Sequence, residues 1–357
     1  MDSSDLAQIP LSIPGRGAAR NPTNRFEKLD IVTDVDAHDP EDPAPSTIFF
    51  NDTTRQIIAT NDSPDVGFSA SINPYRGCEH GCIYCYARPT HEYLGFSAGL
   101  DFETRIMVKQ HAPELLRAAL ADPKWEPKTL QMSGVTDCYQ PIERKLQLTR
   151  RCLAVLAEFR NPVSVISKNH LVTRDIELLS DLARDNAACV ALTITTLDQD
   201  LTQIMEPRTS VPRRRLEAIA ALTAAGVPAG VMVAPVIPGL TEHELPAILK
   251  AARGAGAIFA GYVPLRLPWG IAHLFEDWLG RYLPERMDKI LNRIRALRGG
   301  KLNDPNFGSR MHGQGVWADQ LKLMFTLAQR KAGLEQPFPG LSAAAFRRPP
   351  QAQLSFW

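Results

Sequence analysis

The alternation of short apolar runs with helix-like stretches constrains the fold of this chain more than any other feature. Six runs rich in β-branched residues are predicted to be strands: 67–75, 129–135, 163–168, 189–195, 229–237 and 257–265. Four stretches between them carry apolar residues at three- and four-residue spacing and are predicted to be helices: 145–159, 173–186, 212–226 and 242–256. Such alternation predicts a parallel sheet with right-handed crossovers. We therefore predict an α/β fold, a partial (β/α)6 barrel of the TIM type, because six units are too few to close an eight-fold barrel.

The two ends of the chain differ in composition from this core. Residues 1–45 are rich in Pro, Asp, Asn and Arg without apolar periodicity, and residues 335–357 are interrupted by prolines. Segments of this kind bury too little apolar surface to order themselves, so both are predicted to be flexible extensions. The barrel core is expected over residues 46–270, followed by a C-terminal helical extension over residues 271–334.

The overall composition is that of a globular protein with no global electrostatic bias. The 357 residues include 44% hydrophobic and 22% charged residues, and the formal net charge is +1. Any nucleic-acid-binding surface must therefore be local. The first ten residues are polar and acidic, and no run has the length of a membrane span. We expect a cytoplasmic protein with no membrane contact and with reduced cysteines.

Half of the six cysteines lie in one short loop after the first predicted strand: Cys78, Cys82 and Cys85. In α/β barrels, ligands gather at the C-terminal ends of the strands. The CxxxCxxC spacing allows three sulfurs to approach one centre, and Gly77 and Gly81 allow the backbone to turn tightly. From these residues alone, three interpretations are open. They are buried apolar cysteines, a structural zinc site with His80 or His91 as fourth ligand, and an iron–sulfur cluster with one open iron.

The loop, with Tyr84 before its third cysteine, and the six-unit organisation over residues 65–270 resemble the radical S-adenosylmethionine (radical SAM) superfamily. The resemblance implies a [4Fe-4S] cluster on Cys78, Cys82 and Cys85, with S-adenosylmethionine bound to the fourth iron. It implies an enzyme that receives an electron from an external donor, cleaves S-adenosylmethionine to a 5'-deoxyadenosyl radical and abstracts a hydrogen atom from its substrate.

The ends of the other predicted strands supply candidates for contacts to S-adenosylmethionine. In SGVTD, the resemblance implies that Ser133 and Gly134 offer backbone groups and that Asp137 offers a carboxylate to the methionine ammonium, although the usual motif is Gly-Gly-Glu. Thr195 is a candidate for the ribose hydroxyls, or simply a β-branched residue at a strand end. Arg208 is a candidate for the methionine carboxylate, or a solvated loop arginine. Further candidates line the adenine: Tyr84, Pro238 and Gly239.

Two stretches narrow the resemblance to one branch of the superfamily. Residues 133–150 and 206–228 are similar to the branch related to spore photoproduct lyase, also described as DNA repair photolyase-like. Within it the chain resembles a bacterial group of unassigned function that also carries NFGSRMHGQGVWADQL at 306–321. This resemblance implies that Cys138 returns a hydrogen atom to a product radical and that Tyr139 relays the radical. The alternative for Cys138 is a partly buried thiol.

Local basic residues and the end of the chain bear on the substrate. Arg213, Arg214 and Arg215 begin a predicted helix and are candidates for phosphate contacts, whereas the basic residues of 289–310 are expected to form solvated faces. Residues Gln353 to Trp357, QLSFW, resemble the motif by which bacterial repair proteins dock on the DNA sliding clamp; the alternative is an end folded back on the body. The favoured function is a lyase-like radical SAM enzyme that repairs DNA. The alternatives are modification of RNA or a peptide, and a non-enzymatic zinc- or cluster-binding module.

Overall fold

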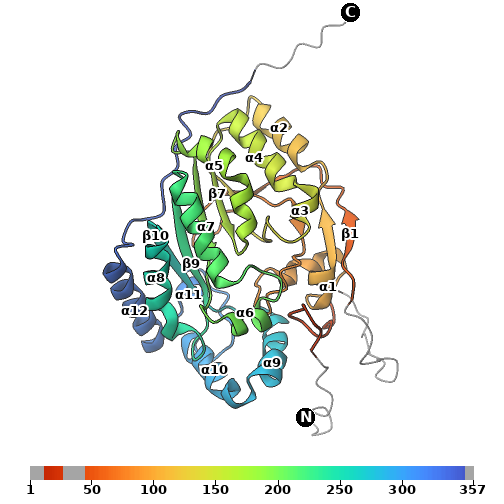
Figure 1. Ribbon diagram of the computed structural model, residues 1–357. Helices are drawn as coiled ribbons and strands as arrows, with labels where there is room; N and C mark the ends of the chain where they lie inside the picture. Colours follow the sequence, from red (N-terminus) through yellow and green to blue (C-terminus); the bar gives the residue numbers. More distant parts are fainter. Residues whose placement is uncertain (1–11, 27–44, 350–357) are drawn as a thin grey trace, which may run out of the picture.

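A seven-stranded sheet forms the centre of the computed structural model, which describes residues 12–26 and 45–349 (Figure 1). The strand order is β10-β9-β8-β7-β6-β3-β2. Six neighbouring strands are parallel: β3 (Ala70–Ile72), β6 (Leu130–Met132), β7 (Val163–Ser167), β8 (Ala188–Thr193), β9 (Ala229–Val236) and β10 (Phe259–Pro264). The short strand β2 (Ile58–Thr60) closes one edge as an antiparallel neighbour of β3. The predicted α/β partial barrel with six parallel strands is confirmed.

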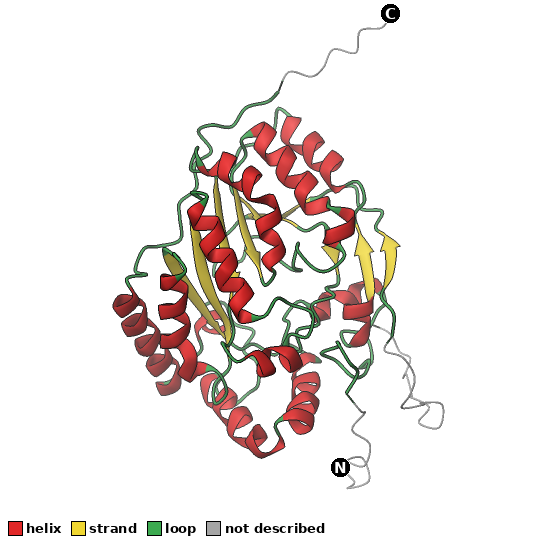
Figure 2. Ribbon diagram, viewed as in Figure 1, coloured by secondary structure: helices red, strands yellow, loops and turns green. Residues whose placement is uncertain are grey.

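Helices cover one face of this sheet, as Figure 2 shows. The connections between strands are α4 (Leu148–Phe159), α5 (Ile176–Ala183), α7 (Pro212–Ala224) and α8 (Leu245–Gly254). The main apolar core lies between these helices and the strand residues that face them, such as Val165, Val190 and Val231. Because successive side chains of a strand point to opposite faces, Ser164, Cys189 and their neighbours face the barrel interior.

The first predicted strand and the first predicted helix are each divided in the structure. The first predicted strand, 67–75, splits into β3 and into β4 (Tyr75–Arg76), because Pro74 between them has no backbone N–H to donate. The first predicted helix splits into α3 (Glu143–Leu146) and α4, with Gln147 between them in the left-handed region at φ 52°. Strand β4 joins a second sheet, in the order β1-β5-β4, that the sequence patterns did not predict. Its other strands are β1 (Ile48–Asn51) and β5 (Arg105–Val108).

At both ends of the described chain, parts of the predicted flexible extensions, residues 12–26 and 335–349, pack on the body of the protein. Near the N-terminus, Ala18 is buried, and its amide donates to the Glu103 carboxylate at 2.8 Å. Near the C-terminus, Phe338 packs on Phe259, and the amide of Arg347 donates to the carbonyl of Phe159 at 2.9 Å. The C-terminal segment runs along the sheet from α12 (Val316–Ala332) towards α2 (Ala112–Ala121) (Figure 1). Hydrogen bonds and the packing of individual aromatic side chains such as Phe338 hold these segments in place despite their composition.

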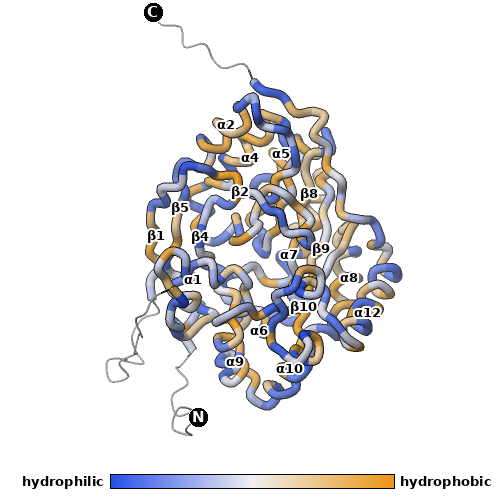
Figure 3. Tube along the Cα trace, turned by 180° about the vertical axis from the view of Figure 1, so that it is seen from behind, coloured by the Kyte–Doolittle hydropathy of each residue, from blue (hydrophilic) through white to orange (hydrophobic). Residues whose placement is uncertain are grey.

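Residues 271–334 form four helices: α9 (Ile271–Tyr282), α10 (Pro284–Leu297), α11 (Ser309–His312) and α12 (Val316–Ala332). Figure 3 shows hydrophobic and hydrophilic residues alternating along α8 and α12, as expected for amphipathic helices that pack on one another. The basic residues of 289–310 are predicted to form solvated faces. This prediction fails for Arg298, whose side chain is fully buried. None of the described helices is both long enough and apolar enough to cross a membrane.

Candidate cluster and cofactor site

A buried ion pair shapes the cysteine loop. Arg88, in the 3-10 helix η1 (Arg88–Leu94), pairs with Glu103 of α1 (Leu100–Thr104) at 2.5 Å, and both side chains are fully buried. The Arg88 guanidinium also donates to the carbonyls of Gly81 and Cys82 at 3.1 and 3.0 Å. Gly81 itself is required, because it has φ 66° and an added Cβ would lie 2.7 Å from Glu103. Sequence reasoning did not find this ion pair, since its partners are fifteen residues apart and carry no motif.

The three cysteines lie close together in this loop, with Cys78 and Cys82 buried and Cys85 half-buried. Burial, then the charge of Asp137, then the other two cysteines raise the pKa of the Cys78 thiol well above its ordinary value. A metal group bound in place of the thiol protons would offset the cost of burying the thiolate and its repulsion from the neighbouring negative charges. Among residues 12–26 and 45–349, no three His, Cys, Asp or Glu side chains are arranged around a single ion. In a cubane each thiolate binds a different iron, so the donor set fits a [4Fe-4S] cluster with one iron left open.

The two histidines considered as zinc ligands have other partners. His80 Nδ1 lies 3.4 Å from the Asp137 carboxylate, and its Nε2 lies 3.2 Å from the Asn169 amide nitrogen. His91 Nε2 lies 2.9 Å from the carbonyl of Arg105, and burial lowers the pKa of His91 to about 4. Both imidazoles thus help to fold the loop.

Tyr84 and Thr195 come together as part of a buried polar network. Their hydroxyls lie 3.2 Å apart, and Tyr84 also donates a short hydrogen bond to Glu206. Arg215 pairs with Glu206 on the other side and donates to the carbonyl of Thr193 at 2.8 Å. Burial opposes ionisation of Glu206, but Arg215, followed by Lys168 and Tyr84, lowers its pKa to about 2. The prediction that Arg215 contacts phosphate is wrong, because this side chain is buried in the network.

Lys168 is a cation at this site that sequence reasoning missed. It follows β7 directly, its ammonium donates to the carbonyl of Ala234 at 3.3 Å, and it lies 5.8 Å from the centre of the Tyr84 ring. Burial raises the pKa of the Cys82 and Cys85 thiols, and the charge of Lys168 opposes that rise in both. Lys168 therefore directs positive charge at the cysteine loop from the carboxyl end of the sheet. The only signal in the sequence was its position as the last residue of a predicted strand.

The segment after β6 is held by hydrogen bonds within the protein. Ser133 has φ 71°, and its hydroxyl accepts the amide of Cys138 at 2.9 Å. The carbonyl of Gly134 accepts the hydroxyl of Tyr86 at 2.8 Å. The Asp137 carboxylate accepts the amide of Lys168 at 2.8 Å. Burial would raise the pKa of Asp137, but its charged and hydrogen-bonded neighbours, His80 first, hold it below the ordinary value. Its predicted contact to the methionine ammonium stays a prediction.

Cys138 and Tyr139 are both fully buried in the main core. The Tyr139 hydroxyl donates to Asp175 at 3.1 Å, and the carbonyl of Cys138 accepts the Thr149 hydroxyl at 2.6 Å. Burial, followed by the charges of Asp137 and Asp175 respectively, raises the pKa of each side chain well above its ordinary value. Their roles as hydrogen-atom donor and radical relay stay predictions.

Arg208, Pro238 and Gly239 lie apart from the network around Tyr84. Arg208 pairs with Glu79 at 3.2 Å in a pocket that is separate from this network. Pro238 and Gly239 are buried beneath α10, and the carbonyl of Gly239 accepts the Arg286 guanidinium at 2.8 Å. The contacts predicted between these three residues and S-adenosylmethionine also stay predictions.

One layer of the barrel interior, near the amino ends of β7 and β8, consists of small and polar side chains. Ser71, Gln131, Ser164 and Cys189 form one layer, because they are paired in register across four neighbouring strands. In a closed barrel this space is filled by large branched side chains.

A cation stands at the same end of the barrel as the cysteine loop. Arg266 follows β10, lies 5.9 Å from the centre of the Tyr86 ring and donates to the sulfur of Met311 at 3.1 Å. Its Nε is buried and has no hydrogen-bond partner within the described part of the chain. Nearby, Arg310 pairs with Asp65 at 2.5 Å. One donor of the Arg266 guanidinium is thus left without a partner beside Tyr86.

The fold and this site define a class of protein, a six-stranded partial barrel with a three-cysteine loop at the carboxyl end of its strands. A family model described as the radical SAM superfamily matches residues 72–252. An uncharacterised protein of Mycobacterium tuberculosis is 37% identical over 243 residues, which cover 67% of this chain and 70% of that protein. The chain belongs to the radical SAM superfamily.

Solved structures support the fold. A mutant of spore photoproduct lyase matches with a TM-score of 0.55 at 15% sequence identity, covering 80% of each chain. Spore photoproduct lyase complexed with dinucleoside spore photoproduct matches with a TM-score of 0.54 at 16% identity, covering 79% of each chain. The predicted family and cofactors are confirmed, since the radical SAM superfamily uses a [4Fe-4S] cluster and S-adenosylmethionine.

Proposed function

We propose that this radical SAM enzyme acts on a nucleic acid, with repair of a DNA lesion as its reaction. Cys78, Cys82 and Cys85 hold the cluster, which supplies with S-adenosylmethionine a 5'-deoxyadenosyl radical for hydrogen-atom abstraction. Burial of Cys78 and Cys82 limits the access of water to their sulfurs. The Arg88–Glu103 pair fixes the backbone between the first two cysteines, so the ligands are held before the cluster binds.

Lys168, Tyr84 and Glu206 have positioning roles in this proposal. Lys168 supplies positive charge beside the loop and can meet the methionine carboxylate of S-adenosylmethionine. The Glu206 carboxylate accepts a hydrogen bond from the Tyr84 hydroxyl and so fixes the ring. The ionised state of Glu206, maintained by Arg215, keeps this orientation throughout the neutral pH range.

The observation that carries the choice of substrate is the position of Arg266 beside Tyr86, at the carboxyl end of the barrel strands. A guanidinium with hydrogen-bonding capacity suits a backbone phosphate, and an adjacent aromatic ring suits a base. A structural neighbour that carries a dinucleoside photoproduct supports the same substrate class. The predicted sliding-clamp motif, Gln353 to Trp357, lies outside the described residues, and no observation supports clamp docking.

The test is 5'-deoxyadenosine formation by the anaerobically reconstituted full chain, reduced with dithionite. We expect ultraviolet-irradiated DNA to raise the rate of formation above that with no DNA, and undamaged DNA to raise it less. Product analysis of the irradiated DNA then identifies the altered base. If RNA or peptide substrates stimulate the reaction and no form of DNA does, the proposed substrate class is wrong.

A further inference from the structure

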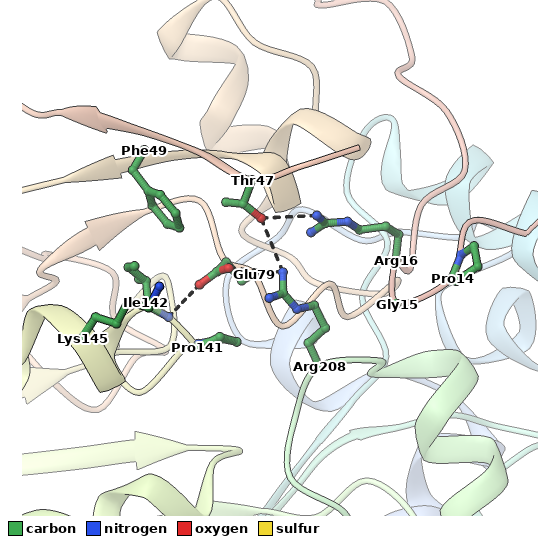
Figure 4. Close-up of a pocket in the computed structure, with 10 residues that line it drawn as sticks. All are labelled: Pro14, Gly15, Arg16, Thr47, Phe49, Glu79, Pro141, Ile142, Lys145 and Arg208. Carbon is green, nitrogen blue, oxygen red and sulfur yellow. Dashed lines mark hydrogen bonds and ion pairs between the residues drawn. The ribbon is translucent and has the colours of Figure 1, made fainter. Parts of the chain in front are cut away.

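A pocket of about 460 Å³ lies against the outer side of the cysteine loop (Figure 4). Its walls come from the N-terminal segment, the residues before β1, the cysteine loop, the start of α3 and the loop after α6 (Gln199–Met205). Six of its residues matter here: Arg16, Thr47, Glu79, Ile142, Lys145 and Arg208. None of them belongs to the network around Tyr84 or to the end of the barrel near Arg266.

The pocket gathers three cations against one carboxylate. The guanidinium groups of Arg16 and Arg208 both donate to the hydroxyl of Thr47, at 3.3 and 3.4 Å, so two like charges converge on one atom. Burial, and after it the charge of Arg208, lowers the pKa of Arg16. Glu79 is shared between Arg208 at 3.2 Å and the amide of Ile142 at 2.7 Å. Lys145 is exposed at the rim and pairs with no carboxylate of the described residues.

Backbone contacts join the pocket directly to the loop of the candidate cluster ligands. Glu79 follows Cys78 in the chain, and the amide of Arg208 donates to the carbonyl of His80 at 3.3 Å. Next to Arg16, Gly17 packs so tightly on Gly81 that an added Cβ would lie 1.8 Å from the Gly81 carbonyl oxygen. The walls of the pocket are thus also the outer wall of the cluster loop.

The pocket is separate from the end of the barrel where the substrate is proposed to bind. The substrate region is built by Arg266 after β10 and by Tyr86, which contacts the segment after β6. The pocket is built by α3, the N-terminal segment and the residues before β1, which Figure 4 shows around Glu79. A partner in the pocket can therefore approach the cluster while substrate occupies the barrel.

We propose that this pocket is the docking site of an acidic, low-potential one-electron carrier protein that reduces the cluster, which rests on the proposed cluster function. One electron passes from the reduced carrier to the oxidised cluster. The carrier is oxidised, the cluster is reduced, and no bond or proton is exchanged. Net positive charge around a site steers an acidic partner and raises its rate of association. The competing occupant of the pocket is a nucleic acid. DNA bound here would lie away from the residues proposed to bind substrate.

The test compares Lys145→Glu with Lys322→Glu, a matched reversal of an exposed lysine on α12. Each reconstituted full-length variant is mixed anaerobically with an acidic reduced flavodoxin, and cluster reduction is followed by its loss of visible absorbance. At low ionic strength we expect Lys145→Glu to lower the bimolecular rate constant about tenfold relative to Lys322→Glu, and we expect salt to narrow this difference. Both variants should be reduced by dithionite at the wild-type rate, because this small reductant needs no docking site.

The outcomes separate the docking site from the proposed function. Equal rates for the two variants with flavodoxin, together with normal reduction by dithionite, overturn the docking site and leave the cluster function standing. Loss of DNA affinity in Lys145→Glu with no change in flavodoxin reduction assigns the pocket to nucleic acid and also overturns the proposal. Failure of dithionite to reduce any cluster in the wild type contradicts the proposed function itself.

Discussion

Replacing Arg215 by methionine is expected to destabilise the protein strongly, because it leaves a buried carboxylate without its cation. Arg215 and Glu206 are both almost completely inaccessible to solvent. Arg215 also donates to the carbonyls of Thr193 and Ser210 at 2.8 and 2.6 Å, which joins β8 to the start of α7. Methionine fills a similar volume but supplies none of these hydrogen bonds.

The size of the effect follows from the pKa of Glu206, which is lowered from 4.5 to about 2. A shift of this size corresponds to about 3 kcal/mol, and breaking a buried ion pair costs about 3–5 kcal/mol. We therefore expect Arg215→Met to lower the free energy of unfolding by about 4 kcal/mol. Adding Glu206→Gln should recover about half of this loss, because the neutral amide has a smaller desolvation penalty. Arg213→Met is the matched control, since Arg213 is exposed and should change stability by less than about 0.5 kcal/mol.

Urea unfolding of the apoprotein, followed by circular dichroism, measures these differences. In the wild type the lowered pKa of Glu206 stabilises the fold above pH 4.5, and this contribution is lost as the pH falls from 4.5 to about 2. In Arg215→Met the buried Glu206 carboxylate has lost its partner, so its pKa is higher in the folded than in the unfolded protein. Acidification therefore protonates Glu206 and removes the cost of burying its charge. The difference between the two proteins should therefore shrink between about pH 7 and about pH 4. A loss no larger than that of Arg213→Met, or a loss independent of pH, would refute this reasoning.

Three further predictions concern contacts that only the structure shows. Gly17→Ala should lower the iron content after reconstitution, because its Cβ would overlap the Gly81 carbonyl, whereas Gly254→Ala on α8 has open space and should not. Arg298→Met should cost about 2–4 kcal/mol in urea unfolding, because the carbonyls of Pro264, Leu265, Ser309 and Arg310 lose their donor; a change within experimental error would contradict this. Arg266→Gln should raise the DNA concentration for half-maximal stimulation about fivefold and reduce its salt dependence, and an unchanged DNA titration would remove Arg266 from the substrate site.

Local patterns predicted the elements of the main sheet because each strand and helix carries its own periodicity. The run 229–237 and strand β9 at Ala229–Val236 nearly coincide, since a buried parallel strand is apolar throughout. The small sheet was missed because β5 has only four residues and follows a helix without a break. The packing of residues 12–26 was missed because it depends on backbone amides that donate to Glu103, and composition carries no information on such contacts.

The candidate site was predicted only where its residues are close in the sequence. The spacing of the three cysteines identified the loop, but Glu206 and Lys168 reach Tyr84 through the tertiary fold and belong to no motif. Arg213 and Arg215 illustrate the limit most clearly. They look equivalent in the sequence, yet the register of α7 exposes the first and buries the second. A phosphate contact and an internal ion pair cannot be distinguished until the helix is placed against its neighbours.

Anaerobic reconstitution of the wild type, Cys82→Ala and Cys152→Ala tests the central claim most directly. Cys152 is a buried cysteine of α4 outside the loop, so it controls for the loss of any thiol. We predict about four irons per chain and visible cluster absorbance in the wild type and in Cys152→Ala. Both signals should be lost in Cys82→Ala, together with 5'-deoxyadenosine formation from S-adenosylmethionine under dithionite. A colourless, zinc-loaded wild type, or a Cys82→Ala variant that retains the full cluster, would contradict the assignment of this loop.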